Sequence, residues 1–143
     1  MQTAVTPRRA LAYFFYLAEG NWNSAAKVAA RLLLNCYNGH RFNFDVTDLR
    51  LLDEKHLDMA LQIMRMDAHC TREVHDHLND MYGRTDFGPR FEHLAWKFTL
   101  KGKCKKDWLS AVEPVTFANP LEETANRAIG DTPCQPLPTR PAV

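Results

Sequence analysis

Apolar residues recur every three or four positions through most of the first hundred residues, which is the spacing of one buried helix face. The first such run lies between Thr6-Pro7, a typical helix start, and Gly20, a typical helix end. The second follows Asn23 and stops at Gly39. Because the first run is apolar on almost every side, we predict that its helix lies at the centre of the fold.

Four further helical runs follow. A short one begins after Asp45, and Asp53 is expected to cap a longer one with an acidic first turn. The third covers about residues 71–83 and the fourth about 89–102. The expected buried stripe of the longer helix is Leu57, Ala60, Leu61, Met64 and Ala68. The pattern predicts an all-α fold, a compact bundle of about five or six helices.

The helical pattern fades after Trp108-Leu109. Residues 131–143 hold four prolines and almost no large apolar side chain, which is typical of a segment that cannot bury enough surface to fold alone. We therefore expect a helical domain over residues 1–109. Residues 110–143 are expected to form an irregular, proline-rich tail that is weakly structured or ordered only by a partner.

The composition indicates an intracellular protein without strong long-range electrostatics. The chain holds 18 Lys and Arg against 17 Asp and Glu. Its four cysteines form no close-spaced pair, which favours reduced thiols in the cytoplasm. The run after Arg8-Arg9 has the length of a short signal peptide, but its four aromatics suit a packed helix better. No apolar stretch approaches the roughly 20 residues that span a membrane.

Charge is nevertheless unevenly distributed along the chain. Residues 83–109 hold seven basic and three acidic side chains, whereas residues 53–82 hold three basic and seven acidic ones. Trp96 and Trp108 accompany a lysine cluster formed by Lys97, Lys101, Lys103, Lys105 and Lys106. Such a cluster suits phosphate contact with base stacking, docking on an acidic protein surface, or simply a solvated helix end.

The acidic region supplies a second candidate binding surface. Its members are Asp58, Asp67, Glu73 and Asp76. Carboxylates of this kind can pair with basic residues that otherwise hold RNA phosphates. We expect the lysine cluster, with Trp108, and these acidic residues to contact the partner.

Catalytic signatures are weak. His69-Cys70, His75 and His77, with Cys36 and His40, could in number hold zinc, but two ligands two positions apart on a helix point away from each other. His75-Asp76 is also similar to the paired ligands of helical phosphohydrolases, with His56 and Asp107 as further candidates that no spacing selects. No phosphate loop, nucleophile elbow or dinucleotide motif is present. We expect no cofactor, no metal and no enzymatic activity.

The succession of the two apolar helices, the Phe44-Asp45-Val46-Thr47-Asp48-Leu49 turn and the long helix after Asp53 resembles a small helical domain of unknown function carried on bacterial plasmids and integrative elements. The likeness covers roughly residues 8–98. It implies a place among the accessory genes of mobile elements, whose small products include inhibitors of RNA-guided CRISPR complexes. It assigns no catalytic residue.

The sequence therefore predicts a non-enzymatic protein-binding module. The sharpest form of this hypothesis is an anti-CRISPR type inhibitor that binds or displaces a subunit of a bacterial defence complex. The alternative is a nucleic-acid-binding accessory protein that uses the basic and aromatic cluster from Lys97 to Trp108. A metal-dependent hydrolase is the third possibility.

Overall fold

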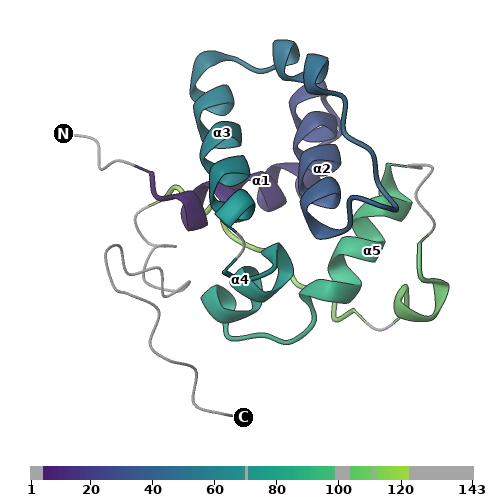
Figure 1. Ribbon diagram of the computed structural model, residues 1–143. Coiled ribbons are helices and arrows are strands. Elements are labelled where there is room, and N and C mark those ends of the chain that lie inside the picture. The colour runs from purple at the N-terminus through teal and green to yellow at the C-terminus, as the bar shows by residue number, and fades with distance from the viewer. Residues whose placement is uncertain (1–4, 70, 99–103, 111, 123–143) are drawn as a thin grey trace.

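The structure is a computed structural model that describes residues 5–69, 71–98, 104–110 and 112–122. Over these residues the fold is all-α, with five α-helices, two short 3-10 helices and no β-strand. Figure 1 shows the helices packed into one body. The predicted fold class and helix number are confirmed. None of the helices in this part of the chain is both long and apolar enough to cross a membrane.

The first two helices begin and end close to the predicted positions. Helix α1 covers Pro7–Gly20, and the Thr6 hydroxyl accepts a hydrogen bond from the amide of Arg9. Helix α2 covers Ser24–Tyr37, and the Asn23 side chain accepts from the amide of Ala26. Both caps satisfy amides that have no partner inside the helix.

The remaining helices follow in order along the chain. A 3-10 helix, η1, covers Val46–Leu51 and is followed by α3 over Glu54–His69. Helix α4 covers Val74–Tyr82 and ends at Gly83, whose φ of 62° is left-handed. Helix α5 covers Phe87–Lys97, starting two residues before the predicted Pro89, and the short η2 covers Lys106–Trp108.

Helix α1 lies at the centre of the fold, as its sequence predicted, and packs against α2, α3 and α4 (Figure 1). Its residues Leu11, Phe14 and Phe15 are almost completely buried. The ring of Phe15 lies 5.2 Å from that of Phe87 and 5.3 Å from that of Phe91, measured between centroids. These aromatic contacts join α1 to α5 in the core.

Helix α3 is rotated relative to the prediction. Leu61 is 50% exposed, whereas Ala60 is buried as predicted, together with Met59 and Ile63. The side of α3 that carries His56 faces α1, because the His56 imidazole contacts the Tyr13 hydroxyl. Two apolar stripes run along α3 at helical spacing, and this tertiary contact selects the one that is buried.

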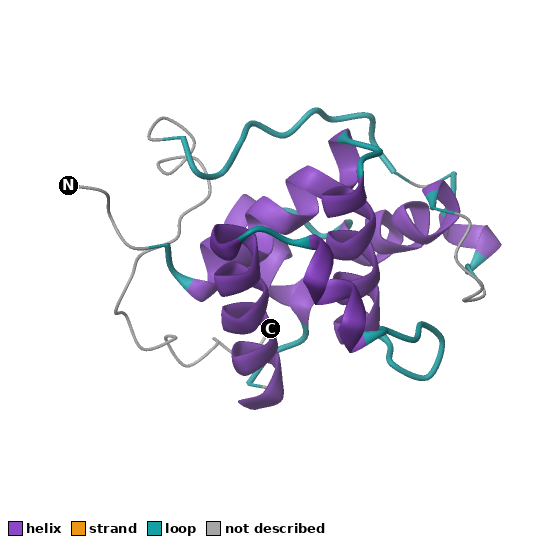
Figure 2. Ribbon diagram, turned by 90° about the horizontal axis from the view of Figure 1, so that it is seen from above, coloured by secondary structure: helices purple, strands orange, loops and turns teal. Residues whose placement is uncertain are grey.

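Packing continues past the predicted domain boundary at Leu109. Residues 112–122, named the strap here, have no regular secondary structure but lie against the helices (Figure 2). Pro120 is buried, and the ring of Phe117 packs against those of Tyr82 and Phe87. The first part of the predicted tail is thus irregular yet packed, and residues 123–143 lie outside the described part.

Candidate protein-interaction surface

Lys97, a member of the predicted lysine cluster, is engaged inside the protein. Its Nζ donates hydrogen bonds of 2.7, 2.8 and 2.7 Å to the backbone carbonyls of Ala18, Glu19 and Asn21. These carbonyls lie at the end of α1, where the last carbonyls of a helix have no amide donors within the helix. A positive charge at this end also interacts favourably with the helix dipole. Burial lowers the pKa of Lys97, and Glu19 opposes this effect. Lys97 therefore caps α1.

The residues around η2 are fixed to α5 through the buried carboxylate of Glu92. The amide of Lys105 donates to Glu92 Oε1 over 2.8 Å. The Tyr37 hydroxyl and the Arg41 guanidinium donate to the same carboxylate at 2.7 Å and at 2.5 and 2.9 Å. Burial alone raises the pKa of Glu92, but these hydrogen bonds outweigh it and lower the pKa.

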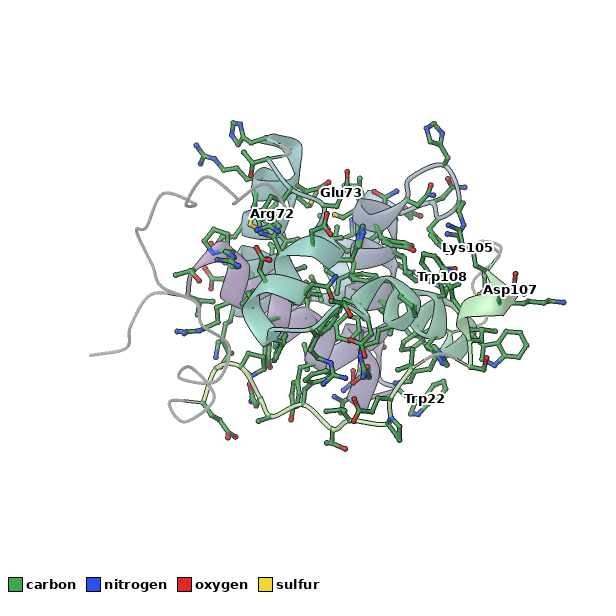
Figure 3. The ribbon with its side chains drawn as sticks, turned by 90° about the horizontal axis from the view of Figure 1, so that it is seen from below. Trp22, Arg72, Glu73, Lys105, Asp107 and Trp108 are labelled. Carbon is green, nitrogen blue, oxygen red and sulfur yellow. The ribbon has the colours of Figure 1, made fainter. Side chains whose placement is uncertain are left out.

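Trp108 packs against the start of α5 at Gly88. A β-carbon at Gly88 would lie 3.1 Å from the Trp108 ring, so glycine allows this close approach. The Nζ of Lys105 lies 4.5 Å from the ring centroid of Trp108, within the range of a cation-π interaction. Lys105, Lys106 and Trp108 are exposed, and Figure 3 shows Lys105 and Trp108 beside α5. Lys101 and Lys103 lie outside the described residues.

Two exposed tryptophans lie at the other end of α5. Trp96 is 62% exposed and Trp22 is 65% exposed. The Trp22 ring contacts Phe98 and lies 4.6 Å from Lys97 Nζ. Trp96 follows Glu92 by one helical turn, so it lies on the side of α5 to which Lys105 is bound. We name the set Trp96, Lys105, Lys106 and Trp108 the α5 surface, with Trp22 at its margin.

The predicted acidic residues do not form one continuous surface. Asp67 and Glu73 lie close enough to interact, and burial followed by Glu73 raises the pKa of Asp67. Asp76 pairs with His75 at 3.8 Å. Asp58 lies nine positions before Asp67 on α3, which places it on the opposite side of that helix. The structure therefore brings Asp67 and Glu73 together and separates Asp58 from them.

The histidines and cysteines considered for metal binding are distributed over different contacts. His75 packs edge-on against Tyr37, and His77 is buried beside Arg8. Cys36 and Cys104 are free thiols, and burial with Asp67 raises the pKa of Cys36 to about 12. Within the described ranges, no three side chains of metal-ligating type converge.

His56, which was considered for a hydrolase, joins Asp53 to Tyr13. Its Nδ1 lies 2.7 Å from an Asp53 oxygen, and its Nε2 lies 3.3 Å from the Tyr13 hydroxyl. The order carboxylate, imidazole, hydroxyl is that of a catalytic triad. However, burial, Tyr16 and Asp53 raise the pKa of Tyr13, which opposes formation of a phenolate nucleophile. Asp53 also accepts from the His56 amide, so the array caps α3 and joins it to α1.

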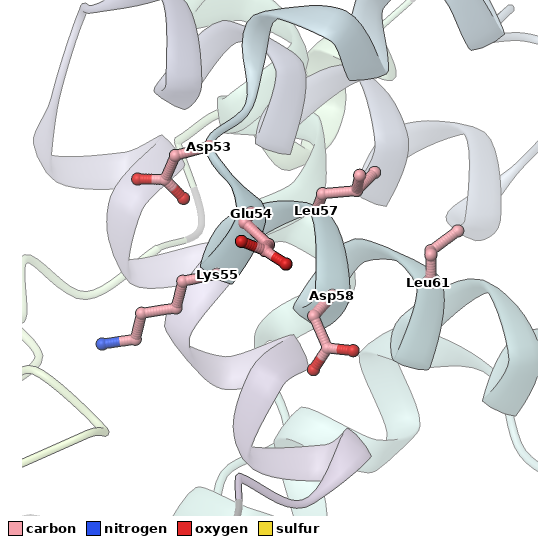
Figure 4. A pocket seen from close by; sticks show the side chains of 6 residues that line it. All are labelled: Asp53, Glu54, Lys55, Leu57, Asp58 and Leu61. Atoms are coloured by element: carbon pink, nitrogen blue, oxygen red, sulfur yellow. The ribbon is translucent and has the colours of Figure 1, made fainter.

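Two hollows of the described surface offer little to a small ligand. One, of about 780 Å³, is an open depression lined by Asp53, Glu54, Lys55, Leu57, Asp58 and Leu61 (Figure 4). These residues follow one another at the start of α3 and provide no opposing wall. A second, of about 270 Å³, lies between α5 and the strap, where Arg90 already binds Asp86 and the Glu113 carbonyl.

Sequence reasoning missed Trp22 and the buried network of Glu92. Trp22 lies two residues after the glycine that ends α1, and an apolar residue in a short interhelical turn was a usable signal for an exposed aromatic. Glu92 lies within the apolar run of α5, where a charged residue among buried positions signals a buried ion pair. Its partner, Arg41, is 51 residues away, and no periodicity connects the two.

No curated protein and no solved structure matches the chain. A model of a family of unknown function (DUF7673) matches residues 8–97, which run from the start of α1 to Lys97. The matched residues include the core, the Arg41–Glu92 pair, Trp22 and Trp96, whereas Lys105, Lys106, Trp108 and the strap lie beyond them. Because the match covers more than half of its 143 residues, the chain belongs to this family of unknown function.

Proposed function

We propose that the protein is a non-enzymatic binding module that docks a protein partner on the α5 surface. The observation that carries this proposal is the exposure of Trp96, which is 62% accessible on a helix whose opposite side is buried. Exposed tryptophans are costly to keep in water and are enriched among the residues that dominate binding energies. Lys105 and Lys106 are exposed beside the same helix and favour a partner with acidic groups.

The nucleic-acid alternative is less well supported. Stacking of a base needs a free ring face, but Lys105 Nζ covers one face of Trp108 and Lys97 Nζ lies over the ring of Trp22. Lys97 also directs its three donors to backbone carbonyls, so it has none left for phosphate. These contacts leave Lys105 and Lys106 as the described lysines of the cluster that can meet a partner.

The nature of the partner rests on the sequence resemblance. That resemblance implies a mobile-element setting and, in its sharpest form, an inhibitor of a bacterial RNA-guided defence complex. The acidic pair Asp67 and Glu73 offers a second contact for a basic subunit of such a complex. This identity stays a prediction, as does the cytoplasmic location.

The test compares capture of bacterial proteins by the wild type and by Trp96→Ala, with Leu61→Ala as the matched control. Leu61 is 50% exposed on α3 and lies outside the proposed surface. We expect a specific partner that is retained by the wild type and by Leu61→Ala, and at least tenfold weaker binding to Trp96→Ala, since loss of a central tryptophan costs about 2 kcal/mol or more.

A partner that binds Trp96→Ala and the wild type equally would rule out the α5 surface. The nucleic-acid alternative has its own measurement, the affinity for single-stranded DNA or RNA at two salt concentrations. If the Lys105→Glu/Lys106→Glu variant loses salt-dependent binding of bare nucleic acid that the wild type shows, nucleic acid replaces protein as the ligand of this surface.

A further inference from the structure

An aromatic anchor holds the strap in the corner between α4 and α5, which we call the groove. The ring centroid of Phe117 lies 4.8 Å from that of Tyr82 and 5.5 Å from that of Phe87. Tyr82 ends α4 and Phe87 begins α5, so the anchor occupies the corner between these helices. An aromatic side chain in such a pocket supplies a large apolar contact at a single position.

Two arginines beside this pocket bind the strap residue Glu113. Arg84 Nη2 lies 2.8 Å from a Glu113 carboxylate oxygen, and Arg90 Nη2 donates to the Glu113 carbonyl over 2.7 Å. The Arg90 guanidinium also lies 5.0 Å from the ring centroid of Phe117. The groove thus recognises a carboxylate and, four residues later, an aromatic ring.

The strap is held as a bound peptide is held. In the described part of the chain, its one backbone-to-backbone hydrogen bond is local, from the Glu122 amide to the Asn119 carbonyl. It adds no strand and no helix to the domain. Because side-chain anchors and one main-chain carbonyl carry the attachment, the strap can leave without breaking a helix.

The family match covers the groove but does not cover the strap that occupies it. Tyr82, Arg84, Phe87 and Arg90 lie within the matched residues 8–97, whereas Glu113 and Phe117 lie beyond them. We propose that this groove is a second peptide-binding site, separate from the α5 surface, which the strap occupies in cis. A partner segment that is extended and carries an acidic residue four positions before an aromatic one replaces the strap.

Tethering makes the strap a strong competitor. A segment joined to its site by a short linker acts at an effective concentration of the order of millimolar. A free peptide with the same contacts therefore binds the wild type weakly. Weakening the strap removes this competition and exposes the groove to a peptide added in trans.

The experiment uses the full chain with Glu113→Ala and Phe117→Ala together. The probe is a fluorescein-labelled synthetic peptide of residues 112–121, and binding is measured by fluorescence anisotropy. We expect saturable binding to the double variant that is at least tenfold tighter than binding to the wild type. The same peptide with alanine in place of its phenylalanine should bind at least tenfold more weakly.

Two further variants test whether the peptide binds in the groove. Adding Arg84→Glu to the double variant should weaken peptide binding at least fivefold, since Arg84 contacts the carboxylate and is partly exposed. Adding Trp96→Ala should leave peptide binding unchanged, which separates this proposal from the α5 surface. Far-UV circular dichroism confirms that each variant is folded.

The proposal is overturned if the folded double variant does not bind the peptide at concentrations up to millimolar. Equal binding of the peptide without its phenylalanine overturns it as well. Should the double variant fail to fold, Glu113→Ala alone serves, because it keeps the aromatic anchor. Hydrogen exchange of the wild type gives an independent measurement: strap amides should exchange at least tenfold faster than those of α5, and equal protection contradicts a detachable strap.

Discussion

The ammonium group of Lys97 lies 2.7 Å from the backbone carbonyl oxygen of Ala18, 79 residues earlier in the chain. Together with two neighbouring carbonyls, this contact closes the end of the central helix α1 with a side chain from the end of α5. A residue expected to meet a partner thus stabilises the domain itself. The remaining candidates for binding are the members of the α5 surface, Trp96, Lys105, Lys106 and Trp108.

Replacing Lys97 by methionine should therefore destabilise the protein. The substitution keeps the apolar stem but leaves the carbonyls of Ala18, Glu19 and Asn21 without their donor. Hydrogen bonds that involve a charged group contribute about 1.5–3 kcal/mol, and we expect a loss of that order in the free energy of unfolding by urea. Lys106→Met, at an exposed position, is the control and should change it by less than about 0.5 kcal/mol. Equal effects would show that Lys97 is not a cap.

Loss of the buried Glu92 carboxylate should cost more. In Glu92→Leu, the Arg41 guanidinium, the Tyr37 hydroxyl and the Lys105 amide all lose their acceptor. Breaking one side of a buried ion pair costs about 3–5 kcal/mol, measurable by chemical denaturation.

The control for Glu92 is the more exposed Arg31–Asp48 pair, whose atoms lie 3.2 Å apart. Asp48→Asn should cost about 0–1 kcal/mol. If Glu92→Leu leaves the free energy of unfolding almost unchanged, the network adds little to stability.

His77 should make stability depend on pH between about 6.5 and 4. Burial lowers the pKa of His77 from 6.5 to about 4, the charge of Arg8 adds to this effect, and Asp76 opposes it. In this window the unfolded chain takes up a proton that the folded protein does not. The contribution of His77 is therefore fully present above pH 6.5 and is lost as the pH falls to about 4. The loss is about 3 kcal/mol, since one pKa unit corresponds to 1.36 kcal/mol.

The variant His77→Leu isolates this contribution. Nδ1 of His77 has no hydrogen-bond partner among the described residues, so leucine removes none there. As the pH falls from 6.5 to 4, the wild type should lose more stability in thermal unfolding than the variant does. Parallel curves for wild type and variant would contradict the lowered pKa.

Gly88→Ala should disturb Trp108. Alanine normally favours a helix over glycine by up to about 1 kcal/mol, but its β-carbon at this position would lie 3.1 Å from the Trp108 ring. We expect no gain in stability and a change in tryptophan fluorescence as the ring shifts. Gly20→Ala is the matched control, because no atom of the described residues lies within 4 Å of its added β-carbon. That variant should gain about 0.5 kcal/mol, with unchanged fluorescence.

Local chemistry made the ends of the helices predictable. Thr6, Asn23 and Gly83 act as caps through their own side chains or backbone, so the sequence around each contains the necessary information. The rotation of α3 was not predictable in this way, because Leu57-Leu61 and Met59-Ile63 offer two apolar stripes. The contact between His56 and Tyr13 selects between them, and it joins residues 43 positions apart.

The candidate surface was predictable only in part. A cluster of lysines with Trp96 and Trp108 can be seen in the sequence, but the role of each member depends on what lies beside it. Lys97 donates to backbone carbonyls at the end of another helix, and the pattern of side chains in the sequence does not predict such a contact. The strap was expected to be weakly structured because irregular, proline-containing segments rarely pack. The ring of Phe117 and the arginine contacts of Glu113 nevertheless anchor it.

The attachment of the strap has a mechanical consequence. Proteases that unfold their substrates often pull on a chain end, and a pull from the C-terminal side would reach the strap before any of the described helices. Its anchors at Phe117 and Glu113 follow one another along the chain and would be loaded one at a time, as in peeling. The helical core would bear force only after both had released. A protease would therefore detach the strap first, and the helices would unfold together in a later step.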